Sequence, residues 1–141
     1  MTERFPRGSI VIYPYLWRWQ EEEGREHGEK SRPVCLAISL ADPRQELTHL
    51  VILPISGTPP IENQKAIEIP SLEIRRAGLS IYKRGWITVG EYNYDIAERS
   101  YFFEPGQKPY GRFGPSFMEE IRQAIRPLLS ARMGRVDRTM R

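Results

Sequence analysis

The sequence predicts a mainly β protein with one C-terminal α-helix, folded as a small SH3-like open β-barrel of about five to six strands. Two continuous apolar runs, at residues 34–38 and 50–53, are bounded by turn residues, as fully buried strands tend to be. The other β-branched and aromatic runs are short, and one amphipathic helical pattern closes the chain. Short strands followed by a single helix over an open side favour a barrel over a sandwich.

The first predicted strand covers residues 10–15, and Pro14 should end its ladder or place it at an edge. Residues 17–30 keep neither a helical nor a strand period, so they are predicted to form a long loop with one helical turn at residues 18–23. Loops of this length are often functional lids, and the glutamates of this one would repel a phosphodiester. Our hypothesis is an acidic lid, in which Trp17 and Trp19 either cap the core or stack on a base.

An arginine and a hydroxyl flank the two apolar runs. Arg32 precedes the first run and Ser56 follows the second, with a turn at residues 41–45 between them. If the strands pair antiparallel, the start of the first lies beside the end of the second, so both side chains are expected at one rim of the sheet. Two structural alternatives stay open: Arg32 holds the loop by a salt bridge, and Ser56 caps a turn.

Three shorter elements are predicted downstream, after a third strand that ends at Pro54. Residues 66–70 alternate as a short exposed strand, and Ser71 is expected to cap a helical turn that Gly78 stops. Residues 85–92 form the last predicted strand, with one face toward the core and the other toward a groove. Residues 92–95 are predicted to be a turn.

The C-terminal helix is predicted to start at Pro115, with Ser116 as its cap and Glu119 completing a capping box. Its apolar residues recur at helical spacing: Phe117, Ile121, Ala124, Ile125 and Leu128. Pro127 should kink or break it. Residues 1–133 are expected to form a single domain, and residues 134–141 a flexible basic tail.

Composition limits the class of protein. A chain of 141 residues that is 40% hydrophobic suits one domain with a real core. Its apolar runs are too short for a membrane span and its first residues are charged, so a soluble cytoplasmic protein is expected. Cys35 is interpreted as a buried hydrophobe. His27 and His49 have no partner thiols, so no metal site and no cofactor are expected.

The formal net charge of +3 is unevenly placed, because seven arginines lie between residues 112 and 141. Such a basic end either contacts phosphates or forms a solvated helix face with a frayed tail, and the sequence leaves both interpretations open.

Several segments resemble the PemK/MazF-like toxin family, whose members are small barrels that cut single-stranded RNA without a metal. The matching segments are residues 7–11, 31–36 and 51–56 together with the closing helix, in the order and spacing of the family. The resemblance implies that Arg32 is the catalytic arginine and that Ser56 contacts the scissile phosphate. It also implies a homodimer whose groove is blocked by a cognate antitoxin peptide.

The chemistry of that assignment is consistent with the residue types. Attack by the neighbouring 2′-hydroxyl needs no protein nucleophile, only stabilisation of the charge that grows on the phosphoryl oxygens, and a guanidinium supplies two aligned donors and a fixed charge. Single-stranded RNA suits this reaction because its backbone can reach an in-line geometry and its bases can stack on aromatic rings. The side chains expected to contact RNA are Trp17, Trp19, Thr58, Trp86, Thr88 and Tyr92.

The sequence departs from the family pattern at residues 86–90, where some members carry a further arginine and an aspartate that are missing here. Glu91 is the nearest carboxylate for a base, or else a surface residue at a strand end. An alternative function is therefore a catalytically silent barrel that binds nucleic acid or protein.

Overall fold

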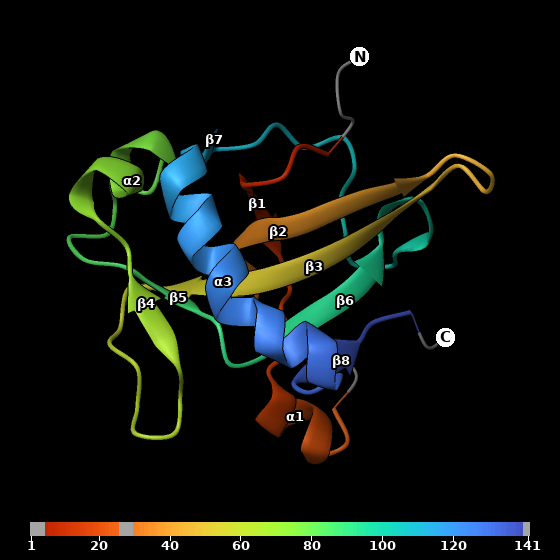
Figure 1. The fold of residues 1–141 in the computed structure, drawn as a ribbon, viewed down its shortest axis with the longest axis horizontal. Coiled ribbons are helices and arrows are strands. Elements are labelled where there is room, and N and C mark those ends of the chain that lie inside the picture. Colours follow the sequence, from red (N-terminus) through yellow and green to blue (C-terminus); the bar gives the residue numbers. More distant parts are fainter. Residues whose placement is uncertain (1–4, 26–29, 140–141) are drawn as a thin grey trace.

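The structure is a computed structural model that describes residues 5–25 and 30–139, and it confirms a mainly β fold with a C-terminal helix. Eight strands in this part of the chain form one curled sheet that is open on one side, as in a half-barrel (Figure 1). The strands are β1 Ser9–Tyr13, β2 Arg32–Asp42, β3 Leu47–Ser56, β4 Ala66–Glu68, β5 Trp86–Thr88, β6 Tyr92–Ile96, β7 Gly111–Arg112 and β8 Arg135–Asp137. The helices are α1 Arg18–Glu22, α2 Ser71–Arg76, the 3-10 turn Ala97–Arg99 and α3 Pro115–Ala131.

The hairpin of β2 and β3 is the centre of the sheet. The two strands pair antiparallel, with Val34 opposite Pro54 and Asp42 opposite Leu47. On its other side β3 pairs first with β6, as far as Ile52, and then with β5 from Ile55 onward. The strand therefore does not end at Pro54 as predicted. Pro54 falls between these two partners, where its missing N–H costs no ladder bond on that side.

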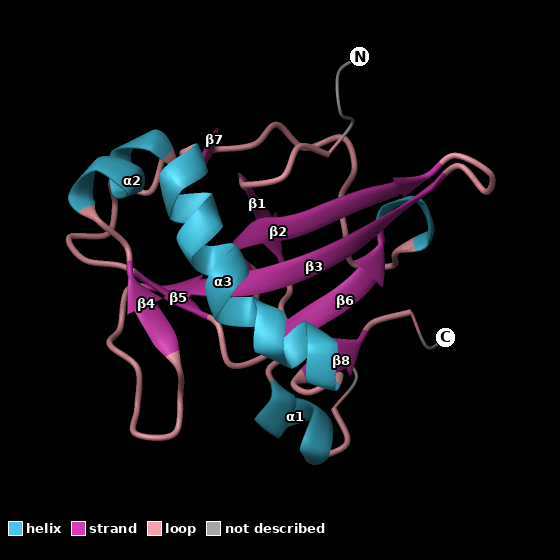
Figure 2. Ribbon diagram, in the orientation of Figure 1, coloured by secondary structure: helices cyan, strands magenta, loops and turns pink. Residues whose placement is uncertain are grey.

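Each face of this hairpin packs into its own core because side chains alternate along a strand. One face lies beneath α3, which crosses in front of β2 and β3 (Figure 2). We call this the helix-side core; it includes Cys35, Leu53, Ile55, Ile121 and Ile125. The opposite face forms the far-side core, which includes Val11, Tyr13, Leu36, Leu50 and Ile52.

The sequence predictions for residues 92–95 and for the C-terminal tail are wrong, because polar residues typical of turns and tails are buried here. Residues 92–95, predicted as a turn at the end of one strand over residues 85–92, belong to a separate strand, β6. Asn93 is completely buried, and its side chain accepts a hydrogen bond from Leu16 N and donates one to Leu16 O. Residues 135–137 of the expected flexible tail form β8, which pairs parallel with β6, and Val136 is fully buried.

Helix boundaries also differ from the prediction. Ser71 and Ser116 lie inside the first turns of α2 and α3, and the N-cap positions belong to Pro70 and Gly114. Pro127 does not break α3, which continues to Ala131. Pro127 is on the exposed side of the helix, where water can satisfy the carbonyl that loses its partner. Within the described residues, no helix has the length and apolar character that crossing a bilayer requires.

Candidate functional site

Arg32 and Ser56 lie at the same rim of the sheet, as the sequence predicts. Extending the register from the pair Val34–Pro54 by two positions brings Arg32, the first residue of β2, opposite Ser56, the last residue of β3. Both side chains line one cavity of about 270 Å³, which we call the Arg32 cavity. This volume is near the lower end of the range of about 300–1,000 Å³ for small-molecule pockets, so it suits a group of about one nucleotide rather than a larger ligand.

The walls of the Arg32 cavity contain most of the predicted RNA-contacting residues. Trp17, Thr58, Trp86 and Thr88 all line it. Trp86 reaches this position because it pairs with Ser56 across β3 and β5, and Thr88 follows on the same face of the strand. The prediction that one face of this strand faces the core and the other a groove is confirmed, since Ile87 packs in the helix-side core.

Six further lining residues were not among the predicted site residues. Lys30 and Gln64 contribute polar side chains, and Pro59, Pro60, Ile61 and Ala66 complete the wall. Lys30 precedes Arg32 by two positions, a spacing that could have indicated a shared face had the strand start been known. Gln64 comes from an aperiodic connection. The described residues of the lining include two cations and no carboxylate, and this charge favours an anion.

The Arg32 guanidinium lies over the ring of Trp17. Its guanidinium carbon is 5.2 Å from the centre of the Trp17 ring, within the range of a cation–π contact, and Trp17 in turn packs edge-on against Tyr15 at 5.1 Å. Arg32 Nε is buried and has no hydrogen-bond partner among the residues that the structure describes. In that part of the chain the loop arginines Arg18 and Arg25 pair with loop glutamates instead. Because Nε is buried, contact with an anion in the cavity would be made by the Nη groups of the guanidinium.

Ser56 does cap a turn, because its Oγ accepts a hydrogen bond from Thr58 N at 3.0 Å. The structural alternative and the functional one are compatible here. A hydroxyl that accepts through a lone pair still has its own proton to donate to a phosphate oxygen or to a 2′-hydroxyl.

Glu91 lies outside the Arg32 cavity. Its carboxylate accepts hydrogen bonds from Tyr15 Oη at 3.1 Å and from Arg18 N at 2.8 Å, so it fastens the start of α1 to the sheet. Burial raises the pKa of this carboxyl above its usual value, although the two hydrogen bonds oppose the shift. A raised pKa suits a proton acceptor near neutrality, but Glu91 does not line the cavity that contains Arg32 and Ser56.

Two of the predicted RNA contacts are also elsewhere. Tyr92 is 3% exposed and packs in the helix-side core. Trp19 is on α1, exposed, with the Arg25 guanidinium 5.1 Å from its ring centre. Neither residue lines the Arg32 cavity.

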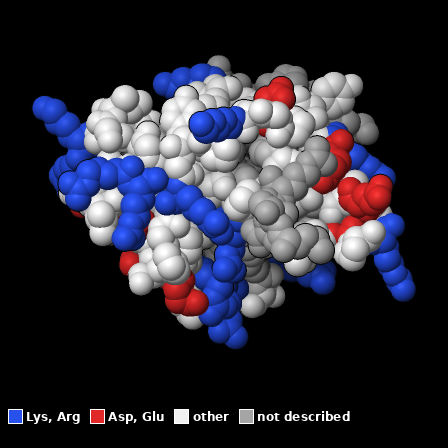
Figure 3. Space-filling view, turned by 90° about the horizontal axis from the view of Figure 1, so that it is seen from above, with Lys and Arg blue, Asp and Glu red and all other residues white. Residues whose placement is uncertain are grey.

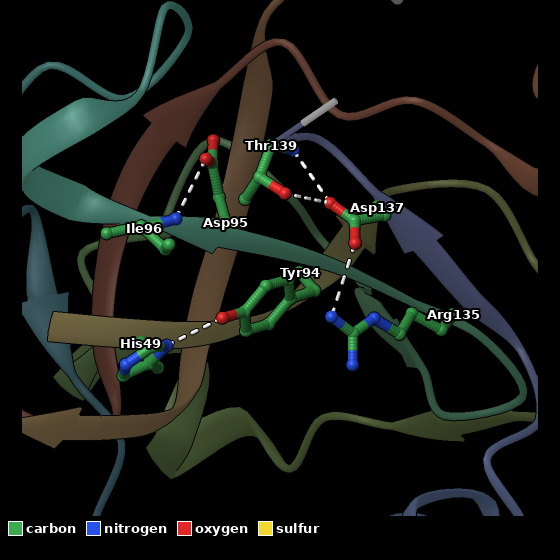
Figure 4. Close-up of polar contacts among 7 residues, drawn as sticks. All are labelled: His49, Tyr94, Asp95, Ile96, Arg135, Asp137 and Thr139. Atoms are coloured by element: carbon green, nitrogen blue, oxygen red, sulfur yellow. Dashed lines mark hydrogen bonds and ion pairs between the residues drawn. The ribbon is translucent and has the colours of Figure 1, made fainter. Parts of the chain in front are cut away.

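The arginine-rich end divides between structural and solvent-exposed positions. Arg135 stacks over Tyr94 at 4.0 Å and pairs with Asp137, and the Tyr94 hydroxyl is 2.6 Å from His49 Nδ1 (Figure 4). Arg138 is buried and donates to Pro14 O and Asn93 Oδ1. His49 thus belongs to a polar cluster on β3, β6 and β8 and does not line the Arg32 cavity. His27 falls outside the described residues.

Among residues 5–25 and 30–139, no group of three or more His, Cys, Asp or Glu side chains is arranged to hold a metal ion. Cys35 is fully buried, and burial raises the pKa of its thiol. The sequence matches no protein-family model, and comparisons with curated proteins and with solved structures gave no significant match. The resemblance to PemK/MazF-like toxins therefore depends on the residues quoted for it and stays a prediction.

Proposed function

We propose that the protein is a metal-independent endoribonuclease of toxin–antitoxin type that cuts single-stranded RNA in the Arg32 cavity. The observation that carries the proposal is that Arg32 and Ser56, from two different strands, line one cavity together with two tryptophan rings. The two cations in the lining, with no carboxylate among its residues in the described part of the chain, support a phosphodiester as the ligand.

The proposed reaction is an intramolecular transesterification. The 2′-oxygen attacks the adjacent phosphorus, a new P–O2′ bond forms, and the P–O5′ bond breaks with its electron pair going to the leaving oxygen. The 2′-hydroxyl proton is lost and a proton is taken up by the 5′-oxygen, which yields a 2′,3′-cyclic phosphate and a 5′-hydroxyl. Arg32 stabilises the charge on the phosphoryl oxygens, which are more negative in the transition state than in the substrate.

The other lining residues have positioning roles in this proposal. Trp17 positions Arg32 by packing its ring against one side of the guanidinium, and Trp86 provides a ring on which a base can stack. Ser56 donates its hydroxyl proton to a phosphate oxygen. Stacking and backbone contacts of this kind favour splayed single strands over duplexes.

A second function, a binding module without cleavage, is favoured by one observation. None of the described residues that line the Arg32 cavity is a carboxylate or a histidine, so the lining offers no conventional general base. Such a module would bind RNA through the same side chains and leave the chain intact. The antitoxin peptide and the homodimer belong to the first function and are expected only with it.

An RNA cleavage assay in EDTA separates the two functions. The full chain is incubated with an end-labelled single-stranded RNA and with the same RNA in a duplex, and products are resolved by size. We expect cutting of the single strand only, and a loss of at least about 10²-fold in Arg32→Ala, because one preorganised donor to a developing oxyanion contributes about that much.

The matched control is Arg44→Ala, which removes an exposed arginine from the turn between β2 and β3. It should cut like the unmodified chain. Binding that Arg32→Ala weakens, without any cutting, would identify the module. Absence of both binding and cutting, with the fold intact by circular dichroism, would refute a role for this cavity in RNA chemistry.

A further inference from the structure

A second and larger cavity lies on the α3 side of the sheet. Its volume is about 780 Å³, well inside the range of about 300–1,000 Å³ that small-molecule sites span. Its apolar lining comes from β2, α3 and the segment before α3: Ala37, Ile38, Phe113, Met118 and Leu129. We call this cavity the arginine cleft, because its polar lining is mostly arginine.

Besides Pro115, the described lining also contains four guanidinium groups and one carboxylate: Arg7, Arg112, Arg122, Arg126 and Glu119. Seen from above, basic side chains form a band on the side of the molecule where α2 and the start of α3 lie (Figure 3). Glu119 forms an ion pair with Arg122 at 2.9 Å, and among the described lining residues arginines outnumber carboxylates by four to one. The cleft therefore keeps an excess of positive charge next to an apolar surface.

The arrangement of the arginines is partly fixed. Arg112 Nε donates to Arg7 O at 2.8 Å, which ties the segment before β1 to β7. Arg122 and Arg126 lie one turn apart on α3, so both side chains project from the same face of the helix. An anionic group bound between them would meet donors on a rigid element, while its apolar part lies against Ile38 and Leu129.

We propose that the arginine cleft binds a small amphipathic organic anion, a carboxylate or phosphate that carries an apolar chain or ring. Charge and surface together select this class. An inorganic anion would leave the apolar lining unused, and a neutral hydrophobic molecule would offer the guanidinium groups no negative charge. The site is separate from the Arg32 cavity, because the two share no lining residue.

The probes for a test are decanoate, decyl phosphate and the neutral analogue decanol. Each is titrated into the full chain, with backbone amide shifts recorded by NMR to locate the site and calorimetry to obtain Kd. We expect saturable binding of both anions, with the largest shifts on α3 and in β2 near Ile38, and at least about tenfold weaker binding of decanol. Binding should weaken as salt is added. The two anions distinguish a carboxylate from a phosphate headgroup.

Charge variants test the arginines directly. Arg122→Gln combined with Arg126→Gln should raise Kd for decanoate by about tenfold, whereas Arg44→Gln should not change it. Glu119→Gln should lower Kd, because it removes the one negative charge in the lining. A gain of affinity cannot arise from a partly unfolded variant.

Four results of the binding experiments would overturn the proposal. These are the absence of saturable binding by either anion, equal affinity for decanol, amide shifts away from α3 and β2, and no response of Kd to Glu119→Gln. The sedimentation coefficient of the ligand-free chain is measured in parallel. If a second copy of the chain covers the cleft, the double arginine variant changes the oligomeric state, and the small-molecule site is refuted.

Discussion

We expect Arg138→Met to lower the free energy of unfolding more than the replacement of any other arginine outside the two cavities. Arg138 is 2% exposed, its Nη1 donates to Pro14 O at 2.9 Å and to Asn93 Oδ1 at 3.0 Å, and its guanidinium carbon is 3.9 Å from the centre of the Phe102 ring. The buried carboxyl of Asp95 is also within its electrostatic reach.

The Met side chain fills a similar volume but supplies no donor. Pro14 O, which is partly buried, loses its donor at about 1–3 kcal/mol, Asn93 Oδ1 keeps only the bond from Leu16 N, and Asp95 loses a compensating cation. On folding, the variant does not have to remove a guanidinium from water, which offsets part of this cost. The net loss in free energy of unfolding should be about 3–5 kcal/mol, as when one member of a buried charged pair is removed. This is a large part of the 5–15 kcal/mol, roughly, that stabilises a typical domain.

Urea denaturation followed by tryptophan fluorescence measures the loss, and Arg135→Met is the matched control. Arg135 is three residues earlier, with a side chain 45% exposed and one ion pair to Asp137, so its replacement should cost less than about 1 kcal/mol. Equal losses in the two variants, or a loss below about 1 kcal/mol for Arg138→Met, would refute the reasoning that the end of the chain is held by buried polar contacts.

Three further predictions follow from single contacts. Burial raises the pKa of Glu91 above its usual 4.5, so the carboxyl binds its proton more tightly in the folded chain than in the unfolded one. This tighter proton binding contributes its full stabilisation below about pH 4.5, and the stabilisation is lost as the pH rises through the pKa of the folded state. The excess stability of the unmodified chain over Glu91→Gln, from urea titrations, should therefore fall as the pH rises above about 4.5, and a flat or rising difference would contradict this. Gly111→Ala should lower the free energy of unfolding by several times the roughly 1 kcal/mol expected for Gly24→Ala. A Cβ at position 111 would overlap the backbone at the end of α2, whereas a Cβ at position 24 meets nothing within 4 Å. Equal melting temperatures of the two variants would exclude the overlap. Trp17→Leu should reduce RNA cutting or binding by about tenfold with little loss of stability, because it removes the ring beside the guanidinium; unchanged RNA titrations would count against that contact.

The two central strands were predictable because their signal is local. A continuous apolar run between turn residues is enough to indicate a buried strand, and the antiparallel hairpin then fixes which ends meet. The shared rim of Arg32 and Ser56 follows from that step alone. The placement of Trp86 and Thr88 on one face also follows, from alternation within a short strand.

β6 and β8 were not predictable because their signal is non-local. Asn93 and Asp95 are typical turn residues, and here they are buried because distant groups satisfy them: Leu16 and Arg138 bond the amide, and Tyr13 Oη donates to Asp95 at 2.8 Å. No window of sequence around β6 contains those partners. The role of Glu91 was missed for the same reason, since its partners are Tyr15, between β1 and α1, and Arg18, the first residue of α1.

β3 has a consequence for how sequences related to this one can vary. All its residues from Leu50 to Ile55 are buried, and those from Leu50 to Leu53 enter the two cores in alternation. An insertion or deletion of one residue there would exchange the contents of both cores at once and move the Ser56 hydroxyl to the wrong side of the sheet. Alignments with related sequences should therefore have no gaps across this strand, and insertions and deletions should occur in the exposed turn at residues 43–46.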